Sequence, residues 1–526
     1  MMYTLYDEKQ KPTVKNHSYT LSNEKHELAA KDKLYTDSNA KEDLLYSNPE
    51  KNYRPLFEGH DQRTVFQHDC DAILYSKSFR RLMRKTQVTY PGTTKNEHTR
   101  TRLTHTLEVM QVARAITQAV GLNSTLSDAI SLGHDLGHTP FGHEGEQFLD
   151  KVCSGSENEG VAVTSLREKY DLKSINFDFK HNYQSVRVLV EWEGSHYDED
   201  EKCSVPGLNI SKQTLEGILK HSKIRRKTEP RKGDLYRYPE IIKKNEFFST
   251  DKNFAVWSVE AQIVGLADEI AQVCHDLDDA IAAEYRVKKQ LYSEIAAFLN
   301  NPIHRKYYEA LENQTFMYKN PCDNRISIHK DVREAFHQFI SWVIGYLIYI
   351  SQTKILEKMD DYRDRKDAES SQYFPLTEEL AGETVTLGDD ELFMFLKKIE
   401  NKYIINNIRI NRENGKADFI LKSIIEAYLN NPNQLPDSVL GRYSADRRII
   451  PEIKKILDEE RKDTVGNVNI RYAFGKEFDS ETLKLLRSDP VFLRYIWDYI
   501  ASMTDQYALN EYKMLYLSDP AYNDAF

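Results

Sequence analysis

Histidine and acidic side chains gather in one short stretch of this sequence, and these residue types can bind metals and transfer protons. Residues 132–146, LGHDLGHTPFGHEGE, interleave histidines with glycines and carboxylates, a composition that packs poorly as a core helix. A helix that begins at Ser124 is predicted to end just after His138, because glycines and a proline follow. His134 and Asp135 then fall in its last turn, where the negative helix end favours a cation. The stretch is therefore a candidate metal site.

Two other segments are predicted to carry further ligands on helices. Residues 100–121 repeat apolar side chains every three or four positions and contain His105. Taken alone, His105 is better explained as a hydrogen-bonded core histidine. Residues 257–285 are strongly apolar yet contain Asp268 among small neighbours. A carboxylate buried there must be paired, protonated or metal-bound, because burying it alone is costly.

Together, His105, His134, Asp135 and Asp268 offer two imidazoles and two carboxylates from three helices. Such a set suits a divalent metal such as Mn, Mg, Fe or Zn, with coordination positions left open for water and substrate oxygens. No thiolate belongs to the set, so a structural zinc site is not expected. The mixed nitrogen and oxygen ligands do not choose the metal.

The elements that must position these residues are helices. From Leu44 onward, apolar residues recur at helical spacing nearly to the C-terminus, without a regular succession of β-branched strands. The sequence therefore predicts an all-α fold. Residues 1–45 are polar and charged, and we expect a flexible arm there.

Three charged or turn-rich breaks interrupt the helical pattern and are predicted to be surface loops. The last break is expected to separate a catalytic core, residues 46–358, from a C-terminal helical region, residues 392–526. The breaks are residues 194–206, 228–239 and 359–391.

Composition narrows the class of protein. The chain has 526 residues and a net charge of −10, which argues against a surface that coats nucleic acid or an anionic membrane throughout. Five scattered cysteines and the lack of a signal-peptide pattern indicate a cytoplasmic protein. The longest apolar run, residues 339–350, is shorter than the roughly 20 residues that span a bilayer, so we expect a buried helix.

The order of His105, the adjacent His134 and Asp135, and Asp268 resembles the signature of the HD-domain phosphohydrolases, an all-α family that holds its metal at these positions. Six further blocks, in the same order, resemble the deoxyguanosinetriphosphate triphosphohydrolase family. A single His-Asp pair occurs by chance in any long chain, whereas six ordered blocks make the resemblance specific. The blocks are residues 79–88, 100–109, 133–146, 181–189, 260–271 and 498–508.

The resemblance implies an HD-domain helical core with an additional C-terminal helical region. It also implies an activity, since members of the family hydrolyse a deoxynucleoside triphosphate to the deoxynucleoside and intact triphosphate. For this chain the expected substrate is dGTP or several dNTPs. The expected cofactor is a divalent metal, Mn or Mg before Fe or Zn, held by His105, His134, Asp135 and Asp268. We also expect a homo-oligomer of four or six subunits.

The resemblance assigns roles to further residues. His143 matches the family's catalytic histidine, which would protonate the leaving 5′ oxygen, and Glu146 would orient its imidazole and favour its charged form. Arg102 matches a position that faces the α-phosphate. The other expected substrate contacts are Gln87 and Asp276 at the deoxyribose, and His138, His181 and Asn182 along the phosphate path.

Two stretches reverse the net negative charge of the chain. Residues 63–102 carry a net charge of +6 and residues 220–244 one of +7. The first suits an anionic substrate, although a solvated helix face would look the same. The second could contact the triphosphate, single-stranded DNA or an activating nucleotide.

Three positions depart from the family pattern, and because of the first, Gln272, strict guanine preference is not carried over. They are Gln272, where relatives often have Tyr, Gln506, where they have a basic residue, and Glu269, where one branch has Lys. Two alternatives stay open. One is another HD-domain phosphohydrolase, acting on a nucleoside monophosphate or on a cyclic or guanosine polyphosphate. The other is a non-catalytic protein that senses nucleotides or single-stranded DNA.

Overall fold

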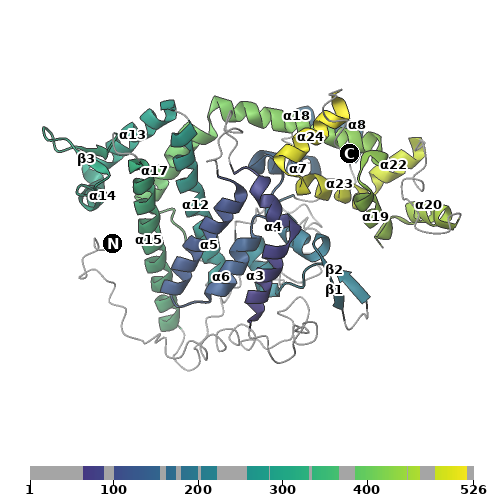
Figure 1. Ribbon diagram of the computed structural model, residues 1–526, viewed down its shortest axis with the longest axis horizontal. Helices are drawn as coiled ribbons and strands as arrows, with labels where there is room; N and C mark the ends of the chain where they lie inside the picture. Colours follow the sequence, from purple (N-terminus) through teal and green to yellow (C-terminus); the bar gives the residue numbers. More distant parts are fainter. Residues whose placement is uncertain are drawn as a thin grey trace.

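The protein is built almost entirely of helices, as its computed structural model shows (Figure 1). Within the residues that the structure describes, strands are limited to two antiparallel hairpins, and this confirms the all-α fold. The described residues are 63–87, 100–154, 161–172, 179–198, 203–221, 258–283, 285–330, 334–365, 385–446, 448–462 and 480–517.

A bundle of helices forms the centre of the molecule. Its core helix α5 packs against both α6 and α12, and α3 and α15 cover the outer faces of this group. Helices α5 and α12 each carry a predicted metal ligand, and α6 leads directly into two of them. The bundle helices are α3 (Val65–Tyr75), α5 (Arg102–Ala119), α6 (Ser124–Gly133), α12 (Val259–Ala283) and α15 (Ala335–Arg365).

Local sequence signals explain where these helices begin and end. Thr101 caps α5 in a capping box, and α5 is followed by Gly121 at a φ of +75°. The Asn123 side chain accepts hydrogen bonds from two backbone N–H groups at the start of α6. However, α6 ends at Gly133, five residues before the predicted end at His138.

Shorter elements surround the bundle on the side of the histidine-rich stretch. They are α4 (Lys77–Arg81), η3 (Leu82–Arg84), α7 (Gly142–Ser154), α8 (Val161–Lys169), α9 (His181–Arg187), η6 (Val188–Trp192), β1 (Ser195–Asp198), β2 (Cys203–Pro206) and α10 (Lys212–Lys220). Strands β1 and β2 pair antiparallel, with Ser195 opposite Pro206.

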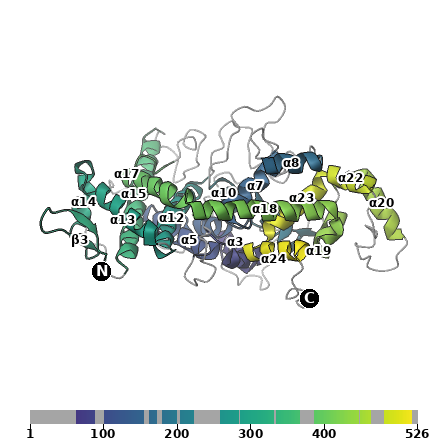
Figure 2. The same cartoon turned by 90° about the horizontal axis from the view of Figure 1, so that it is seen from above.

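The other end of the molecule and the C-terminal region are also helical. Their elements are α13 (Tyr285–Leu299), η7 (Pro302–His304), α14 (Arg305–Leu311), β3 (Met317–Lys319), β4 (Ile326–Ile328), α17 (Glu391–Glu400), η8 (Asn401–Ile405), α18 (Ile408–Asn430), η9 (Pro432–Gln434), α19 (Asp437–Ala445), α20 (Pro451–Lys462), α22 (Ser480–Ser488), α23 (Pro490–Ser502) and α24 (Asp505–Tyr516). Figure 2 shows the long helix α18 running from the α17 end toward the α19–α23 group.

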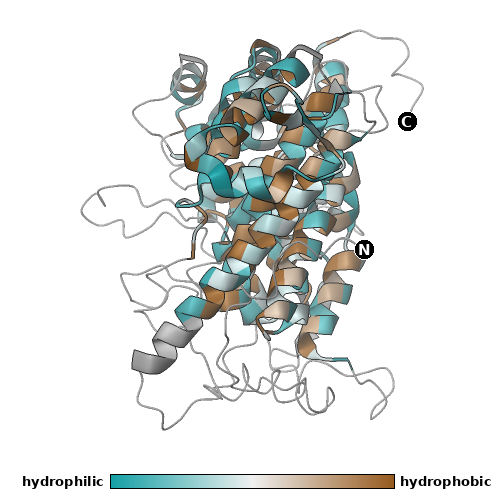
Figure 3. Ribbon diagram, turned by 90° about the vertical axis from the view of Figure 1, so that its left-hand side faces the viewer, coloured by the Kyte–Doolittle hydropathy of each residue, from teal (hydrophilic) through white to brown (hydrophobic). Residues whose placement is uncertain are grey.

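Two apolar cores hold these elements together. The first joins the bundle helices to α17, with Phe339 and Phe393 almost fully buried in it. The second joins α7 and α8 to the helices from α18 onward, around Phe148, Tyr428 and Trp497. The helix that begins beside His143 is thus held by the core of the C-terminal region. Figure 3 views the molecule from the left-hand side of Figure 1, and apolar and polar residues alternate along the helices seen there.

Two predicted loops differ from the structure. Residues 195–198 and 203–206, within the first predicted loop, form the antiparallel β1–β2 hairpin. Helix α15 continues to Arg365, seven residues into the segment 359–391 that was expected to be a loop. Most of that segment, the arm at 1–45 and the break at 228–239 lie outside the described residues.

Helix α15 contains the longest apolar run. By length and composition alone it could cross a membrane. Phe336, Phe339, Val343 and Leu347 nevertheless point into the first core at spacings of three and four residues. This is the pattern of a core helix, as the sequence predicts.

Candidate active site

Two histidines and two carboxylates from three elements meet inside the bundle. The His105 Nε2 atom on α5 lies 3.0 Å from the Asp268 Oδ1 atom on α12. His134 follows α6 directly, and its Nε2 atom lies 3.5 Å from Asp135 Oδ1 and 3.8 Å from Asp268 Oδ1. The structure therefore brings all four predicted metal ligands together.

The hydrogen bonds of His134 fit a metal ligand. Its Nδ1–H donates to the Ser131 carbonyl at 2.6 Å, so Nε2 carries the lone pair. His134 is fully buried, and its Nε2 atom has no hydrogen-bond partner among the described residues. An unsatisfied acceptor is costly in the interior, and a cation would satisfy it. The ligand atoms of His105, His134 and Asp135 lie within 4.8 Å of one another, close enough to share one ion.

Both carboxylates of this site are ionised. Burial opposes the charge of Asp135, but His134, His138 and Arg102 together hold the pKa of Asp135 well below its usual range. Burial also opposes ionisation of Asp268, yet the His105 hydrogen bond and the neighbouring imidazoles lower the pKa of Asp268 below that of a free aspartate. Two ionised carboxylates give the site the charge that a divalent cation needs.

Arg102 is almost fully buried and lies beside the four predicted ligands, here called the metal-ligand quartet. Its Nη1 donates to Asp135 Oδ2 at 2.7 Å. A Cβ atom added to Gly142 would lie 3.3 Å from Arg102 Nη2, so the turn before α7 packs closely on the guanidinium. The buried Nε and Nη2 atoms of Arg102 have no hydrogen-bond partner among the described residues. These nitrogens can donate to an anionic ligand.

A second cluster of histidines adjoins the first. The rings of His138 and His181 are stacked, with centroids 4.0 Å apart, and the His143 ring lies 5.2 Å from that of His138. His138 is linked to the quartet, since its Nε2 lies 3.2 Å from Asp135 Oδ1. Burial and the nearby charges of Arg102 and His181 lower the pKa of His138 well below its usual range, so its imidazole is neutral.

Glu146 joins two histidines of this second cluster. Its Oε2 atom accepts a hydrogen bond from His181 Nδ1 at 2.9 Å and lies 3.6 Å from His143 Nδ1. Although burial opposes it, these imidazoles hold the pKa of Glu146 well below its usual range. His143 itself is half exposed, with 52% of its side chain accessible. The predicted pairing of Glu146 with His143 is thus looser than its contact with His181.

The remaining predicted substrate residues lie in different surroundings. Gln87 and Asp276 are both buried. Burial, followed by the charge of Glu400, raises the pKa of Asp276 well above its usual range, so this pair of carboxyls can hold a proton. Asn182 is also buried, but its Nδ2 donates to the Leu219 carbonyl of α10 at 3.0 Å. That amide group therefore links two helices.

Two histidines of the site were missed in the sequence. His221, at the end of α10, lies with its ring 5.2 Å from that of His134, and burial with the neighbouring His134 lowers the pKa of His221 to about 3. The ring of His275 lies 5.7 Å from that of His105, and its Nε2 is 2.5 Å from Glu108. His221 has no local motif, whereas His275 lies seven residues after Asp268 on α12, a spacing that places both on one helix face.

Most of the described basic residues in 63–102 that lie near the site are already paired. Arg100 bonds Asp278 and Asp279, and Arg102 bonds Asp135. Among the described residues of this stretch, the exposed basic side chains are those of Arg63, Lys77, Arg80 and Arg84. In the second basic stretch only Lys220 is described, and it pairs with Glu216 at 2.9 Å.

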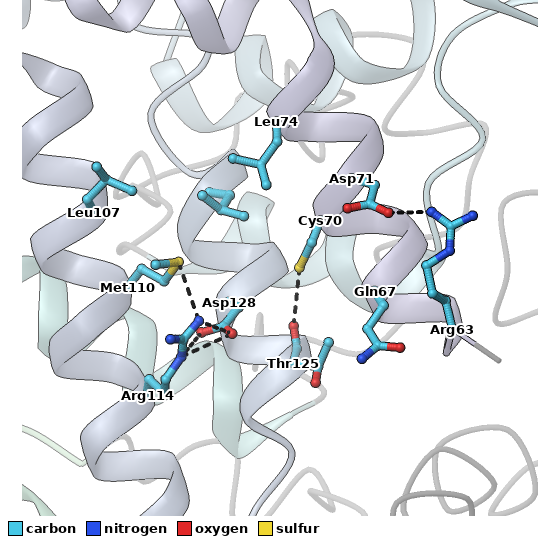
Figure 4. A pocket seen from close by; sticks show the side chains of 11 residues that line it. Arg63, Gln67, Cys70, Asp71, Leu74, Leu107, Met110, Arg114, Thr125 and Asp128 are labelled. Atoms are coloured by element: carbon cyan, nitrogen blue, oxygen red, sulfur yellow. Dashed lines mark hydrogen bonds and ion pairs between the residues drawn. The ribbon is translucent and has the colours of Figure 1, made fainter. Parts of the chain in front are cut away.

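A half-open pocket of about 540 Å³ lies between α3, α5 and α6 (Figure 4). None of the predicted site residues lines it. Its two arginines are matched by carboxylates, Arg63 by Asp71 at 2.6 Å and Arg114 by Asp128 at 2.6 Å. Because these charges are balanced, the pocket is a poor site for a triphosphate.

The fold and the metal-ligand quartet define a class of protein. The family model of the HD domain matches residues 102–272, which span all four ligands, and the model of the phosphohydrolase-associated domain matches residues 474–514. The protein is an HD-domain phosphohydrolase.

Similar proteins narrow this class to a family. A deoxyguanosinetriphosphate triphosphohydrolase-like protein of Wolinella succinogenes is 30% identical over 466 residues, 87% of this chain and 96% of the relative. One of Neorickettsia sennetsu is 32% identical over 406 residues, 76% of this chain and 88% of the relative. The chain belongs to the deoxyguanosinetriphosphate triphosphohydrolase-like family.

Proposed function

We propose that this protein hydrolyses deoxynucleoside triphosphates, dGTP or several dNTPs, to deoxynucleoside and triphosphate, using a divalent metal. One observation carries the proposal. The metal-ligand quartet is joined through Asp135 to Arg102, two of whose nitrogens have no hydrogen-bond partner in the described part of the chain and can bind a phosphate oxygen. The printed name of the relatives supports a deoxynucleoside triphosphate as the substrate class.

The metal would be held by His105, His134, Asp135 and Asp268. It would supply a Lewis acid that polarises a phosphoryl oxygen and acidifies water. The identity of the metal is part of the proposal, with Mn or Mg before Fe or Zn.

The chain's own residues would complete the reaction. Water attacks the α-phosphorus, the bond from phosphorus to the 5′ oxygen breaks, and that oxygen needs a proton to leave. His143 is half exposed and can meet a substrate at this point. His138 is neutral, so it orients a phosphate oxygen by hydrogen bonding and adds no charge. Arg102 offsets the negative charge on the α-phosphate.

Glu146 supports both imidazoles of the second cluster. Its ionised carboxylate holds the His181 ring through Nδ1 and lies 3.6 Å from His143 Nδ1. His181 is thereby fixed with Nε2 directed away from Glu146 and available to the substrate. Gln87 and Asp276 are proposed to contact the deoxyribose, where a close fit would exclude a ribose hydroxyl.

Assembly, regulation and location are proposed from the family resemblance. A homo-oligomer of four or six subunits, an activating nucleotide or single-stranded DNA, and a cytoplasmic location are consistent with the family resemblance. A sensor that binds nucleotides without turnover would use the same pocket, but the presence of the quartet together with His143 and Glu146 favours catalysis.

Product analysis tests the proposal. Metal-stripped protein, and protein reloaded with Mn or Mg, is incubated with each of the four dNTPs and with GTP, singly and mixed, and the products are resolved by ion exchange. Metal-dependent release of deoxynucleoside and intact triphosphate is expected. Release of pyrophosphate, or turnover of nucleoside monophosphates alone, would instead indicate another HD-domain phosphohydrolase. Tight dNTP binding without products would indicate a sensor.

A further inference from the structure

The turn that precedes His143 has an unfavourable backbone. Phe141 has a φ of +64° and Gly142 one of +62°. Glycine adopts this region freely, whereas a bulky residue such as Phe141 does so only when its surroundings hold it there. Because the turn leads directly into α7, whatever holds Phe141 also sets the place of His143.

The Phe141 side chain packs against the second apolar core, and its backbone is held by a residue far along the chain. The Phe141 backbone N–H donates to Asp505 Oδ1 at 2.9 Å. The other oxygen of the same carboxylate, Oδ2, accepts from the Thr86 backbone N–H at 3.0 Å and from the Thr86 hydroxyl. Asp505 therefore ties the turn before His143 to the segment that carries Gln87.

Capping of its own helix does not account for Asp505. Thr504 is the N-cap of α24, and its hydroxyl accepts from the Tyr507 N–H. The Asp505 carboxylate is directed instead at two other segments.

Neighbouring contacts join the same elements. The buried Lys85 amine donates to the His138 carbonyl and, at 3.0 Å, to the Ala501 carbonyl. Arg81 Nη1 donates to the Ser502 carbonyl at 3.5 Å. The connection between α23 and α24 thus contacts the segment of Arg81 and Lys85 and, through Asp505, the histidine-rich turn between α6 and α7. It falls within the region matched by the phosphohydrolase-associated domain.

We propose that Asp505 is a positioning residue of the active site, whose carboxylate holds Phe141 in its left-handed conformation and so fixes His143, at the start of α7, relative to the metal-ligand quartet. The expected change in kcat rests on the proposed function, whereas the expected change in the backbone before His143 does not. The phosphohydrolase-associated domain would then help to position His143 for the reaction.

The experiment compares Asp505→Ala and Asp505→Asn with a matched control, Asp489→Ala. Asp489 is a fully buried carboxylate of the same region that caps α23 and accepts from the Tyr443 hydroxyl at 2.7 Å. No described contact joins it to the histidine-rich turn. Its removal therefore destabilises the C-terminal region without touching His143.

For Asp505→Ala we expect kcat for triphosphate release to fall at least 10-fold, with KM and bound metal within twofold of wild type. The kcat of Asp505→Asn should lie between those of wild type and Asp505→Ala. Its amide oxygen can still accept from the Phe141 N–H, but its NH₂ group faces the Thr86 N–H. Asp489→Ala should keep kcat within twofold at an equal or larger loss of Tm. An unchanged kcat in Asp505→Ala, or an equal loss in Asp489→Ala, would overturn the inference.

Hydrogen–deuterium exchange separates this inference from the proposed function. In both Asp505 variants, peptides that cover residues 139–147 should exchange faster than in wild type, whereas Asp489→Ala should leave them unchanged. Unchanged exchange there in Asp505→Ala would refute the positioning role whatever the enzyme's substrate. If wild type released no triphosphate while exchange rose as expected, only the proposed reaction would fail.

Discussion

At the scale of single residues, the site depends on groups held in the protonation state that their task requires. The Ser131 carbonyl fixes the tautomer of His134 so that its lone pair faces the carboxylates. His143, by contrast, is half exposed and loosely held, which suits a group that must meet a substrate and transfer a proton.

Replacing His143 with Ala tests the role of that imidazole. General acid catalysis contributes on the order of 10²–10⁴-fold, so kcat should fall by at least about 100-fold. Metal content should not change, because His143 lies outside the metal-ligand quartet. Steady-state kinetics and elemental analysis of the same preparations check both statements. A variant with the wild-type rate would show that another group protonates the leaving oxygen.

Lys85 predicts a pH dependence of stability. Burial, which outweighs the nearby charge of Asp505, lowers the pKa of Lys85 from 10.5 to about 7. Between these values the unfolded chain binds the proton more tightly than the folded protein, so this group makes folding more favourable as the pH rises from 7 toward 10.5. Lys85→Met should remove that contribution, which is on the order of 2–4 kcal/mol.

Urea unfolding of wild type and Lys85→Met at several pH values between 7 and 10 measures this effect. The free energy of unfolding of wild type, minus that of the variant, should grow with pH across the window. A difference that stays constant would mean that Lys85 keeps an ordinary pKa in the folded protein.

The residues of the site could be predicted only in part. The order of His105, the adjacent His134 and Asp135, and Asp268 along the chain indicated these four residues through its resemblance to the HD-domain signature, although His105 taken alone looked like a core histidine. The contact between Glu146 and His181, and the place of His221, were not predictable. These residues meet through the packing of distant helices, and a single sequence carries no signal for such contacts.

At the scale of elements, the histidine-rich turn packs closely against α9, and this contact positions the residues of the site. A Cβ atom at Gly137 would lie 2.2 Å from the Ser185 backbone nitrogen and 2.3 Å from the His181 carbonyl oxygen. Gly137→Ala should therefore push α9 away and cost about 2–4 kcal/mol of stability, with a loss of activity. Unfolding curves measure the loss of stability, and turnover measures the loss of activity.

A second glycine provides the control for Gly137→Ala. Gly345 lies within α15, and an added Cβ would meet no atom within 4 Å. Gly345→Ala should be neutral or stabilise by up to about 1 kcal/mol, because alanine favours helix more than glycine does. Equal destabilisation by both substitutions would contradict the contact argument.

Helices were predictable where periodicity and caps agreed, as for α5, and less so where the chain changes direction. Helix α6 ends at Gly133 because the backbone bonds of the following residues tighten to three-residue turns, such as that from the His138 N–H to the Asp135 carbonyl. The glycines and the proline showed that an end was near but not which residue formed it.

At the scale of the whole molecule, the active site lies where the two apolar cores meet. The metal-ligand quartet belongs to the first core, whereas α7, which carries His143 and Glu146, packs into the second. The expected boundary at residues 359–391 does not coincide with this division, since α17 packs with the first core. Alignment of the two halves of the site therefore depends on the C-terminal region.

Metal binding should stabilise the molecule as a whole. A ligand that binds only the folded state raises stability by about 2.7 kcal/mol at 100 times its dissociation constant. Reloading the metal-stripped protein with Mn or Mg should raise Tm, and Asp268→Ala should abolish that rise. Differential scanning fluorimetry over a metal titration makes the measurement, and an equal rise in the variant would place the stabilising ion elsewhere.

Hydrolysis of dGTP in ¹⁸O-labelled water by the metal-reloaded protein is the most direct test of the proposed reaction. Attack of water on the α-phosphorus predicts intact triphosphate that carries one ¹⁸O atom and an unlabelled deoxynucleoside, both absent without metal. Label in the deoxynucleoside, release of pyrophosphate, or no turnover of any dNTP would contradict the account.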